Sequence, residues 1–222
     1  MTGSRKKPKT NPQALKQAVI DAALEHIAFD GFSDALMKRA GKEAGADADE
    51  LAELFPKGAL SLLEAYSDSV DAEMEKRLAK MKITAMPVRA RIALAVKTRL
   101  AILKPHKEAA RRAVAHLSLP QNVPLGMQLV YRSVDAMWRA AGDVSTDFSF
   151  YSKRAILAGV YTATVMRWFT DDTPEESATD EFLAARIENV MQFEKLKAKV
   201  KAGAAKLPSL ADVLAGFSAR KS

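Results

Sequence analysis

The sequence predicts an all-α bundle, and three observations lead to this fold class. Apolar residues recur every three or four positions, which is the period of a helix that buries one face. The 9 prolines divide the chain of 222 residues into segments of helical length. The composition, 48% hydrophobic and 27% charged, is that of a globular chain and excludes a disordered or a polytopic membrane protein.

The first part of the chain predicts three short helices joined by tight turns. They cover about 12–30, 33–45 and 47–55, and the third opens with Asp47 and Glu50 at the spacing of a capping box. The stripe that the first helix would bury is Leu15, Val19, Ala23 and Ile27. Three helices this close together are typical of a helix-turn-helix unit, which we place at residues 12–57.

Longer helices are predicted after Gly58. A connector helix carries the seam Leu60, Leu63, Tyr66, Val70, Met74, Leu78 and Met81, and the helix after Pro87 turns Val88, Ile92, Val96, Leu100 and Leu103 inward. Pro105 ends that helix, a further segment reaches Leu119, and a rigid loop covers 119–124. The next helices cover 125–141, 145–169 and 179–200, and the uncharged run Ala155–Met166 predicts the buried centre of the bundle. Residues 201–208 are predicted to form a linker, which a last short helix over 209–219 follows.

The net charge of +7 is carried by the two ends of the chain. Residues 1–10 hold four Lys or Arg and no acid, a charge of +4, and residues 194–222 hold seven Lys or Arg against two acids, a charge of +5. The remaining residues, 11–193, therefore carry a net charge of −2. Basic ends on a slightly acidic body favour electrostatic tethering through the ends over a basic face laid along a duplex. We expect residues 1–11 to be a disordered basic tail.

Catalytic and metal-binding motifs are not apparent in the sequence. The chain has no cysteine, and His26, His106 and His116 are far apart and lack the spacing of a metal site or a catalytic triad. No glycine-rich phosphate loop is present either. We therefore expect no cofactor and no catalytic residue, and we interpret the histidines as ordinary surface or helix residues.

The three-helix unit, the connector and the helical body together are similar to the fold of TetR-type regulators. A DNA-binding member of that family needs cations on its third helix to neutralise phosphates. Here residues 42–58 hold five Asp or Glu against Lys42 and Lys57, a net charge of −3. The resemblance thus implies the fold, while the charge predicts that the chain does not bind nucleic acid.

The segment 117–161 carries a more specific resemblance. Its stretches LSLPQNVP (117–124), DAMWRAAGD (135–143) and STDFSFYSKRAILAGVY (145–161), and the later FLxxRIExVM (182–191), resemble the signature of the family of the ninth coenzyme Q biosynthesis protein. The resemblance covers most of the chain from about residue 12. It implies a TetR-like, lipid-binding accessory protein of ubiquinone synthesis that works with the di-iron hydroxylase of demethoxyubiquinone.

A partner-docking patch is implied at the start of the helix over 145–169. Phe148, Phe150 and Tyr151 fall within one turn, so they cannot all point into one core. The resemblance places Phe150 in an exposed patch that docks the hydroxylase, with Asp147, Tyr151, Lys153 and Arg154 around it. The alternative is that these aromatic residues cap the bundle internally and that Arg154 pairs with Asp147 or Asp143.

Lipid binding is also implied by the resemblance, because a methionine-rich stripe on its own is more often plain core. The expected pocket lies between the helices over 125–141 and 146–169 and would hold an isoprenoid quinone or a phospholipid. Its predicted lining is Met127, Val130, Met137, Gly159, Tyr161, Met166 and Trp168.

The segment 201–222 predicts an amphipathic membrane-binding helix. Leu207, Leu210, Leu214 and Phe217 form an apolar stripe, and Arg220 and Lys221 add cations at its end. Such a stripe can lie among anionic headgroups, where each basic residue contributes about 1 kcal/mol. The alternative is a helix packed on its own bundle or on a second copy, and the resemblance favours the membrane.

These observations predict a non-enzymatic lipid-binding protein with a helical body at 58–200. It would present a polyprenyl quinone intermediate to the hydroxylase, pair as a homodimer and lie peripherally on an inner membrane. We expect a bacterial protein, because the helical pattern starts by Pro12 and leaves no room for the organelle-targeting segment of eukaryotic relatives. Two alternatives stay open. One is a TetR-type transcriptional regulator with a hydrophobic ligand, and the other is a small-molecule enzyme of unknown type.

Overall fold

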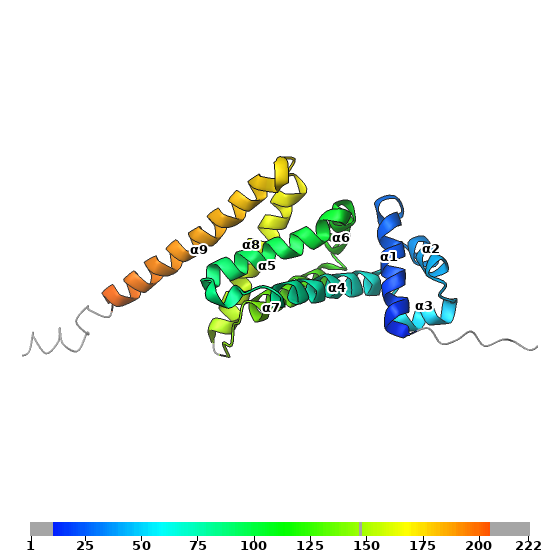
Figure 1. The fold of residues 1–222 in the computed structure, drawn as a ribbon, viewed down its shortest axis with the longest axis horizontal. Coiled ribbons are helices and arrows are strands. Elements are labelled where there is room, and N and C mark those ends of the chain that lie inside the picture. The colour runs from blue at the N-terminus through cyan, green and yellow to red at the C-terminus, as the bar shows by residue number, and fades with distance from the viewer. Residues whose placement is uncertain (1–10, 147, 205–222) are drawn as a thin grey trace, which may run out of the picture.

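Every regular element of the structure is a helix, in a computed structural model that describes residues 11–146 and 148–204. Figure 1 shows an N-terminal group of short helices at one end of an elongated helical body. The elements are α1 (Pro12–Asp30), α2 (Asp34–Ala44), α3 (Ala48–Leu54), α4 (Ala59–Ala79), η1 (Ile83–Ala85), α5 (Val88–Leu103), η2 (Lys104–His106), α6 (Lys107–Leu117), α7 (Val123–Ala140), α8 (Phe148–Phe169), η3 (Pro174–Glu176) and α9 (Ser177–Ala204). The predicted all-α class is confirmed.

The N-terminal unit forms for the local reasons that the sequence indicates. Ser33 caps α2 through its side chain, and α2 ends at Gly45, whose φ of 77° suits a residue without a side chain. Asp47 and Glu50 form the predicted capping box of α3. The predicted stripe of α1 is fully buried, at Leu15, Val19, Ala23 and Ile27.

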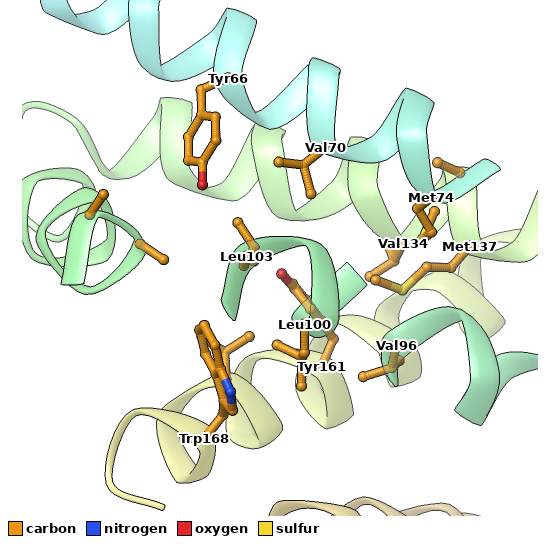
Figure 2. Close-up of a cluster of buried hydrophobic side chains, with 14 of the residues drawn as sticks. Tyr66, Val70, Met74, Val96, Leu100, Leu103, Val134, Met137, Tyr161 and Trp168 are labelled. Carbon is orange, nitrogen blue, oxygen red and sulfur yellow. The ribbon is translucent and has the colours of Figure 1, made fainter. Parts of the chain in front are cut away.

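The body is held by one apolar core. α4 packs against α5 and α7, and α8 packs against α7 and α9. Figure 2 shows how these helices direct side chains toward one another, with Tyr66, Val70 and Met74 from α4, Val96, Leu100 and Leu103 from α5, Val134 and Met137 from α7, and Tyr161 and Trp168 from α8. Most of the predicted seams of α4 and α5 therefore face this core.

Both ends of the α4–α5 connection depart from the prediction. α4 ends at Ala79, so Met81 lies beyond the helix and its side chain is 45% exposed. Val88 was predicted to point inward and is 50% exposed, because it is the first residue of α5 and lies outside the packed part of that helix. At the other end of the seam, Leu60 is only partly buried.

The run Ala155–Met166 is not the fully buried centre that its lack of charge predicts. Leu157, Tyr161 and Val165 point into the core, but Ile156 and Met166 are 37% and 42% exposed. Ala155, Gly159 and Thr162 are exposed between them. One side of α8 is therefore covered by neighbouring helices and the other is open in the single chain.

The turn between α8 and α9 is organised by one carboxylate. Asp171 accepts hydrogen bonds from the backbone N–H and the hydroxyl of both Thr173 and Thr179. Hydrogen bonds from the side chains of Thr173 and Thr179 hold the pKa of Asp171 below its usual range. α9 runs to Ala204, four residues past the predicted Val200, and its last turns extend beyond the body in Figure 1.

None of the helices in the described part of the chain is both long and apolar enough to cross a membrane.

Candidate functional site

The first turns of α8 carry an aromatic pair at the end of the body that lies far from α1–α3. Tyr151 is 65% exposed, and Phe150 is partly buried beside it, with the two rings edge to face and their centres 5.1 Å apart. Phe150 is therefore the base of the patch and Tyr151 is its exposed tip. Of the predicted patch, Asp147 lies outside the described residues, as does the side chain of Phe148.

Arg154 does not surround the patch on the surface, as predicted, but supports it from below. Only 2% of the residue is exposed, because its guanidinium donates to Asp135 at 2.6 Å and to Asp143 at 3.2 Å. The same guanidinium donates to the carbonyl of Phe150, and its Cζ lies 3.4 Å from the centre of the Phe150 ring. A cation over an aromatic face is attractive, so Arg154 fixes Phe150 to α7 and to the loop before α8.

Asp143 is the residue on which the loop between α7 and α8 converges. Lys153 and Ser145 both bond its Oδ1, and Arg154 bonds its Oδ2. Burial alone would raise the pKa of Asp143, but the hydrogen bonds from these three residues outweigh it and lower that pKa to about 2. Asp143 is therefore ionised at neutral pH and holds both cations in place.

Lys153 lies in this network as well, and it is partly exposed. Its ammonium lies 5.4 Å from the centre of the Trp138 ring, and the indole N–H of Trp138 donates to the carbonyl of Lys153. The sequence-based prediction assigned no role to Asp135 or Trp138, and it named Asp143 only as an alternative partner of Arg154, a pairing that the structure contains. In the sequence, the clustering of two acids, a tryptophan and an arginine within residues 135–143 is the pattern that could have indicated this network.

The network joins three helices. Arg139 pairs with Asp135 one turn away on α7 and with Glu75 of α4 at 2.9 Å. Asp135 in turn reaches Arg154 on α8. The aromatic patch thus stands on a chain of ion pairs that runs from α8 through α7 to α4.

Tyr161, predicted to line a lipid pocket, belongs to a second polar cluster inside the body. Its hydroxyl accepts a hydrogen bond from Arg99, which is 6% exposed and pairs with Asp71 at 2.7 Å. Ser133 donates to the other oxygen of Asp71, and Ser67 accepts from Arg99. Every member has a partner, so this cluster is a satisfied core feature that joins α4, α5, α7 and α8.

The remaining predicted lipid residues do not gather around one cavity. Met137 and Trp168 are fully buried in the core, Val130 is partly buried, and Met127 and Met166 are exposed on different helices. Gly159 lies on the open side of α8, where an added Cβ would have no atom within 4 Å, so it creates no space inside the bundle. A hollow of about 240 Å³ between α4 and α7 is lined mainly by charged residues, among them Asp68, Asp71, Glu75, Arg132, Asp135 and Arg139.

The predicted membrane-binding residues Leu207, Leu210, Leu214, Phe217, Arg220 and Lys221 all lie outside the described residues. Their role stays a prediction.

Comparison with known proteins adds sequence relatives and structural neighbours. Residues 123–194 match the COQ9 family model. A rat protein, "Ubiquinone biosynthesis protein COQ9, mitochondrial", is 43% identical over 107 residues, which is 48% of this chain and 34% of the rat protein. The bovine protein of the same name is 30% identical over 210 residues, 90% of this chain and 64% of its own length. The human protein is 28% identical over 206 residues, with the same two shares of 90% and 64%.

Two solved structures share the fold. A TetR transcriptional regulator from Nitrosomonas europaea superimposes with a TM-score of 0.65 at 18% identity, over 80% of this chain and 97% of the regulator. A TetR regulator from Rhodococcus sp. gives a TM-score of 0.58 at 15% identity, over 78% of this chain and 96% of its own. The TetR-like fold is thus confirmed, and at these identities the likeness concerns the fold alone. The chain spans at most 64% of the rat, bovine and human relatives.

Proposed function

We propose that this chain, whose residues 123–194 match the COQ9 family model, is a non-enzymatic accessory protein of ubiquinone biosynthesis. It binds a polyprenyl quinone intermediate at the membrane and presents it to the demethoxyubiquinone hydroxylase. In a bacterium it acts peripherally at the inner membrane, which it reaches through residues 207–222.

The observation that carries this proposal is the aromatic patch at the start of α8. Tyr151 is 65% exposed on a base formed by Phe150 and the buried Arg154. Exposed tyrosines on a rigid base are typical anchors of protein interfaces, because little conformational entropy is lost when they are covered. The patch lies within residues 123–194, where the chain matches the COQ9 family model.

Lipid binding and pairing of two chains are both supported by the open side of α8. Ile156 and Met166 are exposed there, with Gly159 between them, so an apolar strip lies uncovered in the single chain. Apolar strips of this kind usually mark a partner or a lipid. We propose that a homodimer covers part of this strip and that the isoprenoid lipid contacts Met166 and its neighbours.

The docking proposal is tested by a charge at the exposed tip of the patch. Tyr151→Lys in the full chain should abolish capture of the demethoxyubiquinone hydroxylase, with the melting temperature unchanged, since the Tyr151 ring is mostly in water. Phe29→Lys is the matched control, because Phe29 is 87% exposed on α1, and it should leave capture intact. Full capture by Tyr151→Lys would contradict the proposal.

The lipid and membrane parts are tested separately. Lipid extracted from the purified full chain should contain an isoprenoid quinone or a phospholipid, and extraction of neither would contradict lipid binding. Deletion of residues 207–222 should reduce flotation with liposomes while the melting temperature of the body stays the same. Undiminished flotation would exclude those residues as an anchor, and unfolding would support the alternative that they pack on the body.

A further inference from the structure

The connection between α4 and α5 is the most basic segment of the body. Residues 76–91 hold six Lys or Arg and no acid. Lys76 and Arg77 pair with Glu73, and Arg91 is taken up by backbone carbonyls. The other three, Lys80, Lys82 and Arg89, are exposed, and no ion pair joins them to any residue within 11–146 or 149–193.

Two apolar side chains stand among these three cations. Met81 and Val88 are 45% and 50% exposed, although both were predicted to be inward. Between them Ile83 is 7% exposed and enters the core, which fixes the loop from within. We call Lys80, Met81, Lys82, Val88 and Arg89 the basic loop surface.

The loop is braced by three hydrogen bonds from the side chain of Arg91. Arg91 donates to the carbonyls of Thr84 and Met86 within the loop, and to the carbonyl of Ala141 at the end of α7. Met81 and Val88 are therefore presented outward by a braced loop and are not simply the ends of frayed helices. The bond to Ala141 also places the loop beside the α7–α8 connection, where Val144 is 90% exposed.

The basic loop surface lies at the end of the body opposite α1–α3. In Figure 1 the α4–α5 loop and the α7–α8 loop both lie at the left end, and the last turns of α9 extend past that same end. The end of α9 at Ala204 therefore lies on the same side of the molecule as this surface.

We propose that the basic loop surface is a membrane contact in its own right, which lies on an anionic bilayer with Met81 and Val88 in the headgroup region. Unpaired cations that flank exposed apolar tips match the two layers of a lipid surface, the anionic phosphates and the apolar region beneath them. A duplex would satisfy the cations but would leave Met81 and Val88 without an apolar environment. This contact goes beyond the proposed function, because it requires neither residues 207–222 nor the hydroxylase.

A fluorescent label at the tip of the loop tests whether it enters a bilayer. The chain has no cysteine, so Met81→Cys in the full chain can be labelled at one position with an environment-sensitive dye. Emission should rise and shift to the blue with vesicles of phosphatidylcholine and phosphatidylglycerol, and should stay unchanged with phosphatidylcholine alone. Phe29→Cys, labelled in the same way on α1, should respond to neither.

Charge reversal tests which cations are responsible. The triple variant Lys80→Glu, Lys82→Glu, Arg89→Glu should weaken binding to the anionic vesicles at least about 100-fold, since each cation near such a surface strengthens binding about fivefold. The matched control is Lys38→Glu, Lys42→Glu, Lys57→Glu, which changes the net charge equally on exposed lysines of the N-terminal unit and should weaken it far less.

Both triple variants are measured with and without residues 207–222, and their melting temperatures are recorded. If the variant at Lys80, Lys82 and Arg89 does not fold, the label at residue 81 is the deciding measurement. Three results would overturn the proposal: a label that responds to no vesicle, equal weakening by the two triple variants, or a label that responds to duplex DNA and not to vesicles. None of these results bears on capture of the hydroxylase, so the two proposals fail independently.

Discussion

The guanidinium carbon of Arg154 lies 3.4 Å from the centre of the Phe150 ring, while its nitrogens bond the carboxylates of Asp135 and Asp143. The aromatic base of the patch is thereby stacked on a charge that cannot move, because Asp135 and Asp143 hold it from α7 and from the loop that follows. The patch is ordered before any partner arrives, which lowers the entropic cost of docking.

Arg154→Met should destabilise the fold by about 2–3 kcal/mol, because it leaves two carboxylates short of a partner in a mostly buried site. The loss of stability should be smaller than for carboxylates left with no partner at all, since Asp135 keeps its ion pair with Arg139 and Asp143 keeps its ion pair with Lys153. Urea unfolding measures the change. Arg39→Met is the control, because its ion pairs are half exposed, and it should cost at most about 1 kcal/mol. Equal effects of the two variants would contradict a structural role for Arg154.

Phe150→Lys should lower the melting temperature as well as hydroxylase capture, because the new ammonium would stand beside the buried Arg154 guanidinium. Phe150→Leu keeps the apolar volume and should retain most of the stability. Thermal melting alongside pull-down separates the two effects. If Phe150→Lys melts like the unmodified protein and only binding is lost, Phe150 is a free surface anchor and the stacking on Arg154 is dispensable.

Acid should weaken the fold through Asp143. Its pKa is about 2 in the folded chain against an ordinary value of 3.8, so its ionised form stabilises the fold above pH 4 and that contribution is lost as the pH falls from about 4 to about 2. The shift corresponds to about 2 kcal/mol. Unfolding free energies of the unmodified chain and Asp143→Asn should therefore converge over this interval. A constant difference down to pH 2 would show that the titration of Asp143 is not involved.

Two glycines of the same region should respond in opposite directions to alanine. Gly142 has a φ of 83° and an added Cβ would lie 3.3 Å from Arg91, so Gly142→Ala should cost about 1 kcal/mol or more. Gly159 is within a helix with open space around it, so Gly159→Ala should stabilise the single chain by up to about 1 kcal/mol. Differential scanning calorimetry compares them. Destabilisation by Gly159→Ala would indicate that something packs against the open side of α8.

The N-terminal unit should not bind duplex DNA specifically. α3 and its approaches expose Asp47, Asp49 and Glu53, and these carboxylates would meet phosphates of like charge. Electrophoretic mobility shifts against a library of palindromic duplexes should show no preferred sequence at moderate salt. A preferred site with a steep salt dependence would restore the regulator as an alternative.

The sequence was informative wherever a local rule determines the structure. The Asp47 capping box, the Gly45 turn and the start of α1 at Pro12 each depend on residues within one turn of one another, and the structure has all three. Periodicity likewise identified the inner seams of α4 and α5.

What the sequence could not supply is the pairing of residues from different helices. Arg99 and Asp71 are 28 positions apart, and nothing in either helix alone says that each buries the charge of the other. For Arg154 the sequence offered Asp143, eleven positions away, as an alternative partner, but it did not indicate the bond to Asp135 on a separate helix. The open side of α8 was missed because an uncharged segment has the same composition whether a helix of its own chain or another molecule covers it.

The Asp171 turn has a mechanical consequence. α9 is 28 residues long, so at 1.5 Å per residue it is a lever arm of about 42 Å whose pivot is the pair of threonines bound to that carboxylate. A rotation of about 10° at the pivot would move the far end of such an arm by about 7 Å. The position of Ala204, at the far end of α9, thus depends on four hydrogen bonds near the start of the helix together with the packing of α9 against α8 and α5.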